Sequence, residues 1–110
     1  MAKRRTEDSV KIERFIESLR NHLELDKVIL FGSWAKGKQK RWSDIDLAVI
    51  SNHFERMNFH DRLVLLGILA WQSKATEIEA LGYTLDEYKH ATRMDFLGEI
   101  KRTGKIIYEK

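Results

Sequence analysis

Hydrophobic residues recur along this chain with different spacings, and the spacing separates helices from strands. Over residues 8–25 and again over residues 58–72 they recur at intervals of three and four, which is the repeat of one helix face. Asp8 or Ser9 is placed to cap the first helix and Asn58 the second. The second segment carries apolar residues around most of its circumference, so we expect that helix to be well buried. The apolar positions are Ile12, Phe15, Ile16, Leu19 and Leu23 in the first segment, and Leu63, Val64, Leu66, Ile68, Leu69 and Trp71 in the second.

Shorter segments have the apolar runs or the alternation of β-strands, and they are residues 27–31, 44–50, 75–81 and 105–109. Thr84 and Glu87 have the spacing of a capping box, which predicts a helix that starts at Thr84. This helix is expected to break near Thr92 and to resume to Thr103, where Gly104 ends it. The order of elements predicts an α/β fold of the α+β kind, with a small mixed sheet of three or four strands packed against helices.

The size and composition of the chain narrow its class. It has 110 residues and a mass of 13.0 kDa, which suits a single domain over residues 1–110. No apolar run approaches the roughly 20 residues of a membrane helix, and no apolar segment follows the basic start MAKRRTED as in a secretion signal. Cysteine is absent, which excludes disulfides, thiolate metal sites and cysteine nucleophiles. A cytoplasmic protein is therefore expected.

The distribution of charge is more informative than its sum. The formal net charge of +3 is too small to indicate nucleic-acid binding by itself. Basic residues gather in a flexible arm over residues 1–7 and in a loop before residue 44, and they are Lys3, Arg4, Arg5, Lys36, Lys38, Lys40 and Arg41. The arm and loop leave a nucleic-acid-binding role open as a minor alternative, and such binding would weaken steeply with salt.

The candidate chemistry lies in residues 28–51, where an apolar strand, a Gly-Ser turn, the basic loop and a second strand follow one another. Asp44 and Asp46 are separated by one residue, so in a strand both carboxylates face the same way, with Cα atoms about 6.5 Å apart. Gly32 and Ser33 form a turn whose free backbone amides favour an anion. The simpler interpretation of Asp44 and Asp46 is a solvated strand start.

Paired carboxylates beside an anion-binding turn suit a metal-bound triphosphate. Mg²⁺ prefers oxygen ligands and is commonly shared between carboxylates and substrate phosphates. Two such ions about 3.5–4 Å apart activate an attacking oxygen and stabilise a leaving one. A third carboxylate would complete the ligands of the ion that activates the acceptor. Glu77 and Glu79 are both candidates, because alternate residues of the next strand share one face. The spacing alone does not choose between them.

The segment LFGSWAKGKQKRWSDIDLAVIS resembles the signature of the minimal nucleotidyltransferases, the compact branch of the DNA polymerase beta-like superfamily. The similarity extends to IEALGYTLDEY, in which the family has a third acid between apolar residues. The resemblance implies a nucleotidyltransferase-like fold and transfer of a nucleoside monophosphate from an NTP, with ATP expected. It also implies the antitoxin half of a toxin–antitoxin pair, beside a helical HEPN-type partner.

Carried over by position, the resemblance assigns Mg²⁺ binding and catalysis to Asp44, Asp46 and Glu79, with two metal ions expected. The residues assigned to the nucleotide are Gly32, Ser33, Lys36 and Ser43. Lys36 replaces a frequent arginine and lacks its planar grip on phosphate, and Glu79 replaces the commoner aspartate.

Two functions of different class are therefore expected. One is an enzyme that transfers a nucleoside monophosphate to an acceptor hydroxyl, for which a partner protein is the expected source because 110 residues leave little room for an acceptor-binding domain. The alternative is a non-catalytic nucleotide-binding subunit that neutralises its partner by occlusion.

Overall fold

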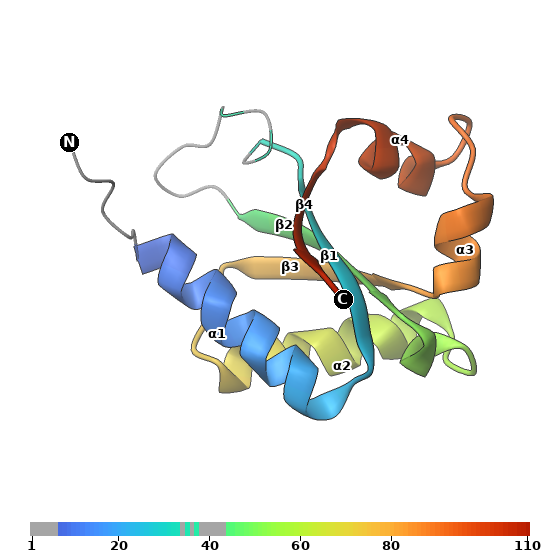
Figure 1. The fold of residues 1–110 in the computed structure, drawn as a ribbon. Coiled ribbons are helices and arrows are strands. Elements are labelled where there is room, and N and C mark those ends of the chain that lie inside the picture. The colour runs from blue at the N-terminus through green and yellow to red at the C-terminus, as the bar shows by residue number, and fades with distance from the viewer. Residues whose placement is uncertain (1–6, 34, 36, 38–43) are drawn as a thin grey trace.

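The computed structural model describes residues 7–33, 35, 37 and 44–110. Its helices are α1 (Glu7–His22), the short 3₁₀ helix η1 (Asn52–Phe54), α2 (Phe59–Gln72), α3 (Leu85–His90) and α4 (Phe96–Thr103). Its strands are β1 (Leu25–Phe31), β2 (Ile45–Ser51), β3 (Ile78–Tyr83) and β4 (Lys105–Glu109). The fold is a mixed α+β fold with a small sheet packed against helices, which confirms the predicted class (Figure 1).

The four strands form one sheet in the order β3-β2-β1-β4. The strand β1 pairs antiparallel with both β2 and β4. The pairing of β2 with β3 is parallel, and η1 and α2 make the crossover between them. A parallel pair needs such a crossover because both strands begin at the same end of the sheet, and the chain must return to that end before the second strand starts. The sheet is therefore antiparallel on one side of β2 and parallel on the other.

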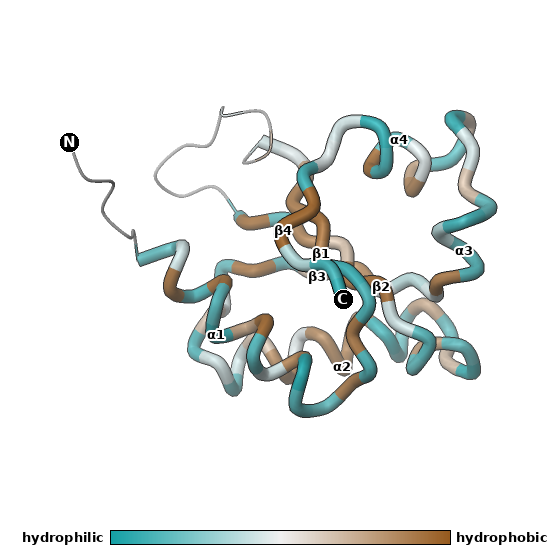
Figure 2. Tube along the Cα trace, in the orientation of Figure 1, coloured by the Kyte–Doolittle hydropathy of each residue, from teal (hydrophilic) through white to brown (hydrophobic). Residues whose placement is uncertain are grey.

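The two faces of the sheet are covered differently. The face that contains Leu47 packs against α1 and α2 and forms the larger core, with Phe15 and Leu19 of α1 and Leu66 and Leu69 of α2 fully or almost fully buried. Figure 1 shows α1 and α2 on this side and α3 and α4 toward the other, and Figure 2 shows hydrophobic residues concentrated along the strands. A smaller core fills the second face, and it consists of Ile29, Ala48, Ile50, Leu97 and Ile100.

The helix caps were predicted with mixed success. The Asn58 side chain accepts a hydrogen bond from the Asp61 amide at the start of α2, and Thr84 and Glu87 form the expected capping box at the start of α3. The prediction for the first helix was wrong, because Asp8 lies inside the first turn of α1 rather than ahead of it. A carboxylate there still interacts favourably with the helix dipole.

The third strand begins later than its alternating sequence suggested. Residues 75–77 belong to a turn in which the Ala75 amide bonds back to the Ala70 carbonyl at 2.9 Å and the Ile78 amide bonds to the Ala75 carbonyl at 3.0 Å. These bonds close the end of α2, so regular pairing with β2 starts only at Ile78. β3 then runs to Tyr83, beyond the predicted end.

The expectation that α2 is buried on most sides was wrong. Leu66, Leu69 and Ala70 face the core, whereas Val64 and Ile68 are each 47% exposed. Further along the same outer side, Trp71 is 72% exposed. The helix lies in the outermost layer of the fold, so only the stripe that faces the sheet and α1 is covered. Among the described residues, no helix has both the length and the apolar content needed to cross a membrane.

Candidate active site

The carboxylates predicted from sequence meet where β2 and β3 begin. Asp46 is the second residue of β2, and its register partners are Phe31 on β1 and Glu79 on β3. Register partners on adjacent strands lie about 5 Å apart and project from the same face of the sheet. Asp44 immediately precedes β2 and is exposed. The strands thus bring Asp46 beside Glu79 and place Asp44 next to both.

A glycine turn closes against one of these carboxylates. Gly32 follows β1 with φ of +75°, a conformation that side chains disfavour. A Cβ atom at Gly32 would lie 2.4 Å from Oδ2 of Asp46, closer than any van der Waals contact allows. Two separate features therefore favour glycine at this position: the positive φ angle and the close approach of the Asp46 carboxylate. The half-buried Ser33 follows in the same turn.

The carboxylates repel one another. Burial, and then the charge of Asp44, raises the pKa of Asp46. A side-chain hydrogen bond with Asp44 and then its charge raise the pKa of Glu79, with smaller contributions from burial and from Asp46. Like charges at close range disfavour the ionised forms. The cluster therefore concentrates negative charge that a cation would relieve.

A comparison with models of protein families shows to which family the chain belongs. The model of the family described as "Polymerase beta, Nucleotidyltransferase" matches residues 13–110, which is most of the chain. The chain belongs to this nucleotidyltransferase family. A comparison with curated proteins finds no match.

Solved structures share the fold of this nucleotidyltransferase at low sequence identity. A toxin–antitoxin structure with AMP-PNP has a TM-score of 0.61 and 21% identity, and the match covers 89% of this chain and 73% of that one. A mutant of the toxin–antitoxin MntA-HpeT has a TM-score of 0.57, with the same identity and coverage. BolA1 from Arabidopsis thaliana has a TM-score of 0.55 and 20% identity over 70% of this chain and 94% of its own. These likenesses concern the fold alone.

The acids of the nucleotidyltransferase fit a metal that is shared with its substrate. Within the part of the chain that the structure describes, no three Asp, Glu, His or Cys side chains are arranged as a complete metal site. Mg²⁺ is commonly bound by one or two carboxylates together with substrate phosphates and water, rather than by an all-protein cage. Carboxylates that raise one another's pKa match that mode of binding, because a cation bound between them would offset their repulsion.

The structure distinguishes the two glutamates that the spacing left open. Glu79 is exposed on β3 opposite Asp46. Glu77 lies before β3, where its Oε2 accepts a hydrogen bond from Lys11 Nζ at 2.8 Å. This hydrogen bond is the largest cause of the lowered pKa of Glu77. Glu77 therefore ties the turn before β3 to α1, and Glu79 is the one that joins the cluster.

A cavity of 280 Å³ opens beside Asp46 and includes residues that sequence reasoning missed. Phe31 of β1 and Phe96 of α4 meet edge to face in it, with ring centroids 5.8 Å apart. The same cavity is lined by Gly32, Asp46, Glu99, Ile100 and Thr103. No local sequence pattern marks Phe96 or Thr103 as part of a site, because only the packing of α4 on the sheet brings them to Asp46.

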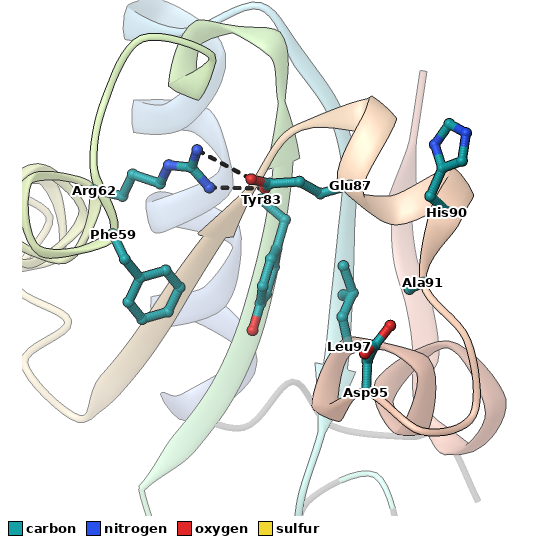
Figure 3. Close-up of a pocket in the computed structure, with 8 residues that line it drawn as sticks. All are labelled: Phe59, Arg62, Tyr83, Glu87, His90, Ala91, Asp95 and Leu97. Carbon is teal, nitrogen blue, oxygen red and sulfur yellow. Dashed lines mark hydrogen bonds and ion pairs between the residues drawn. The ribbon is translucent and has the colours of Figure 1, made fainter.

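A second cavity, of 340 Å³, lies farther along the same sheet face (Figure 3). Figure 3 shows the ring of Tyr83 between Phe59 on one side and Leu97 on the other. Tyr83 is four residues beyond Glu79 on β3, or about 13 Å at the rise of a strand. The cavity therefore continues the face that carries the acids.

Arg62 forms one wall of this second cavity. It is 6% exposed, and its Nη1 and Nη2 donate to the two Glu87 carboxylate oxygens at 2.8 and 3.3 Å. It also donates to the carbonyls of Met57 and Gly82. Burial opposes ionisation of Glu87, but hydrogen bonds from Arg62 and from the Thr84 amide outweigh it and lower the Glu87 pKa. Arg62 thus joins α2, β3 and α3, and its role here is structural.

Two predicted nucleotide-binding residues, Lys36 and Ser43, lie outside the described residues, as does most of the basic loop. The basic arm is outside them as well, apart from Glu7. Gly32 and Ser33 are described, and Gly32 lies against Asp46.

Proposed function

We propose that this protein is an Mg²⁺-dependent nucleotidyltransferase that moves a nucleoside monophosphate from an NTP, with ATP the expected donor, to a hydroxyl of an acceptor. The observation that supports this most is the register of Asp46 with Glu79, beside Asp44 and against the glycine turn. Membership of the nucleotidyltransferase family supports the same reaction class.

The reaction exchanges a phosphoanhydride bond of the NTP for a phosphoester bond to the acceptor. The acceptor oxygen attacks the α-phosphorus, an O–P bond forms, and the bond between the α-phosphorus and the bridging oxygen breaks. Pyrophosphate leaves with that oxygen, and the acceptor loses its hydroxyl proton. Bound Mg²⁺ would neutralise phosphate charge and favour ionisation of the acceptor hydroxyl.

The protein's own residues divide this work by position. Asp44, Asp46 and Glu79 would hold two Mg²⁺ ions. Asp46 lies on β2, between its register partners Phe31 on β1 and Glu79 on β3. Glu79 is on β3, the edge strand of the sheet, so an acceptor reaches the cluster from that edge and gives its proton there. The amides of Gly32 and Ser33, with Lys36 and Ser43, would hold the phosphates.

We further propose that the acceptor belongs to a partner protein and that the pair is a toxin–antitoxin module, with this chain as antitoxin. The fold shared with two toxin–antitoxin structures supports this assignment. A helical HEPN-type toxin is the expected partner. Neutralisation by nucleotide transfer requires the acids, whereas neutralisation by occlusion does not, so the two modes are separable.

The test is transfer of label from ATP carrying a radioactive α-phosphate to a co-purified partner, with the other three NTPs in parallel. Asp46→Asn should abolish labelling while circular dichroism shows an unchanged fold. Full activity of folded Asp46→Asn protein would refute the metal assignment. If the Asp44→Asn, Asp46→Asn, Glu79→Gln triple variant still neutralises the toxin in cells, occlusion is the mode.

A further inference from the structure

The outer side of α2 is an apolar surface on the sheet face opposite the acids. Val64 and Ile68 are each 47% exposed, Leu63 is 39% exposed and Trp71 is 72% exposed. Gly67 lies among them, and a Cβ atom added to it would have no neighbour within 4 Å. The segment from Leu63 to Gln72, LVLLGILAWQ, contains no charged residue, although charged residues make up 34% of the chain. We call Leu63, Val64, Gly67, Ile68 and Trp71 the α2 face.

An uncharged helix surface of this kind is unusual for contact with water. Solvent-facing helix positions normally carry polar or charged side chains, and contiguous apolar patches mark interaction sites. Val64, Ile68 and Trp71 follow one another at intervals of four and three, which is the spacing of a seam between two helices. The α2 face therefore has the pattern of one half of a helix–helix contact.

The charges at the two ends of the α2 face show what fits it. Asp61 lies in the first turn of α2 and Lys74 follows its last turn, and both are exposed. They are equally far from the midpoint between Gly67 and Ile68. If two copies of α2 pair antiparallel about that midpoint, each Asp61 meets the partner's Lys74.

The same register matches the apolar side chains by size. Val64 lies against the partner's Trp71, and Ile68 lies over the partner's Gly67, whose missing side chain lets the two helices approach. A hollow of 580 Å³ at the end of α2, lined by Trp71, Gln72, Lys74 and Thr76, leaves room for the partner's first turn.

The backbone around Lys74 is already fixed in the single chain. Lys74 adopts φ of +57°, and Arg14 of α1 donates to the carbonyls of Ser73 and Lys74 at 2.9 and 3.3 Å. The backbone that carries Lys74 is thus held by α1 rather than left on a fraying helix end, which reduces the backbone entropy lost on pairing.

We propose that the α2 face binds the α2 face of a second copy of this chain, forming an antiparallel, two-fold symmetric dimer. A two-fold contact uses the same patch on both subunits, as this self-complementary register requires. The acids lie on the other face of the sheet, so both sites remain open. The proposal is independent of the proposed catalytic function.

The contact is expected to be reversible. A 14-residue helix is about 21 Å long and offers less than the roughly 800 Å² per partner of a standard interface. The test is sedimentation equilibrium on the full chain from micromolar to submillimolar concentrations. The mass should rise from 13.0 kDa toward twice that value as concentration increases.

Ile68→Glu and Trp71→Glu should each weaken the dimer at least about tenfold, because they bury a carboxylate against an apolar partner. Met94→Glu is the matched control, since Met94 is 89% exposed in the turn between α3 and α4 and should leave the dimer intact. Both α2 residues are exposed, so melting curves should show that the variants fold.

Charge reversal tests the register itself. Asp61→Lys alone and Lys74→Asp alone should each weaken the dimer, and the double variant should restore it. A wild-type chain that stays monomeric at all concentrations would overturn the proposal. Self-association that is unchanged by Ile68→Glu would also overturn it. The same holds if Trp71→Glu abolishes binding to a different protein or to lipid vesicles but leaves self-association unchanged.

Discussion

Gly32 and Asp46 approach so closely that a side chain at position 32 would require the Asp46 carboxylate to move. The missing Cβ atom would lie 2.4 Å from Oδ2 of Asp46. Gly32→Ala should therefore displace the carboxylate as well as strain the backbone, and a misplacement of about 1 Å can lower catalysis about a hundredfold. We expect nucleotide transfer to fall by about that factor, measured with labelled ATP.

Gly37 supplies the matched control for this substitution. Its φ is +70°, close to that of Gly32, but an added Cβ atom would have no neighbour within 4 Å. Gly37→Ala should cost about 1 kcal/mol through backbone strain, as Gly32→Ala also should. Equal loss of transfer in both variants would show that strain, and not contact with Asp46, is the cause.

The cluster should make the protein's stability depend on pH and on Mg²⁺. The pKa values of Asp46 and Glu79 are raised in the folded chain, so the unfolded chain gives up these protons first as pH rises. Stability should fall as pH rises from the ordinary carboxyl pKa values through the raised ones. Added Mg²⁺ at neutral pH should raise the melting temperature of the wild type.

Asp46→Asn removes one of the repelling charges, so its metal-free form should melt at or above the wild-type temperature. Its melting temperature should respond little to Mg²⁺. Differential scanning fluorimetry with and without Mg²⁺ checks both statements, and equal Mg²⁺ stabilisation of variant and wild type would contradict the site.

Two glutamates near the start of β3 offer a paired test. Glu79→Gln should lower transfer at least about a hundredfold if Glu79 takes the acceptor proton. Glu77→Gln should leave transfer near the wild-type level, because Glu77 is engaged with Lys11. The reverse pattern in the labelled-ATP assay would reassign the third acid.

The Arg62–Glu87 pair should carry stability rather than activity. Arg62→Ala leaves the carbonyls of Met57 and Gly82 without this donor and should cost about 3 kcal/mol in urea unfolding. Arg102→Ala breaks the exposed pair with Glu99 and should cost under about 1 kcal/mol.

The same pair predicts an acid dependence. The pKa of Glu87 is lowered in the folded chain, so its stabilising contribution is present above the ordinary glutamate pKa and is lost as pH falls through the lowered value. Glu87→Gln should flatten that part of the pH–stability curve. An unchanged curve would show that other carboxyls dominate acid unfolding.

The features predicted correctly from sequence depend on neighbours along the chain. Capping at Asn58 and Thr84 follows from side chains that reach their own helix. The strand predicted over residues 44–50 runs instead from Ile45 to Ser51, so Asp46 lies within it and Asp44 just ahead of it. Glu77 and Glu79 have the same parity, so only the register with β2 and the contact with Lys11 separate them. That information is not local.

The exposed α2 face was misjudged for a related reason. Apolar residues around a helix indicate burial only if every side has something to pack against, and the sequence does not specify the layers. In the structure the outer side of α2 has no covering element within the described residues, so Val64 and Ile68 face outward. The cavity wall at Phe96 likewise depends on where α4 docks.

The parallel pairing of β2 with β3 has a consequence for folding. Asp46 and Glu79 lie on strands joined by the η1–α2 crossover, so we expect them to come together later than the β1–β2 hairpin forms. Long-range parallel pairing is slow to form because the entropy of loop closure is lost before the contacts between the strands contribute stability. Partially folded chains in which β3 has not docked would lack the complete acid cluster. A newly made chain would therefore be able to bind metal at this site only after β3 has paired with β2.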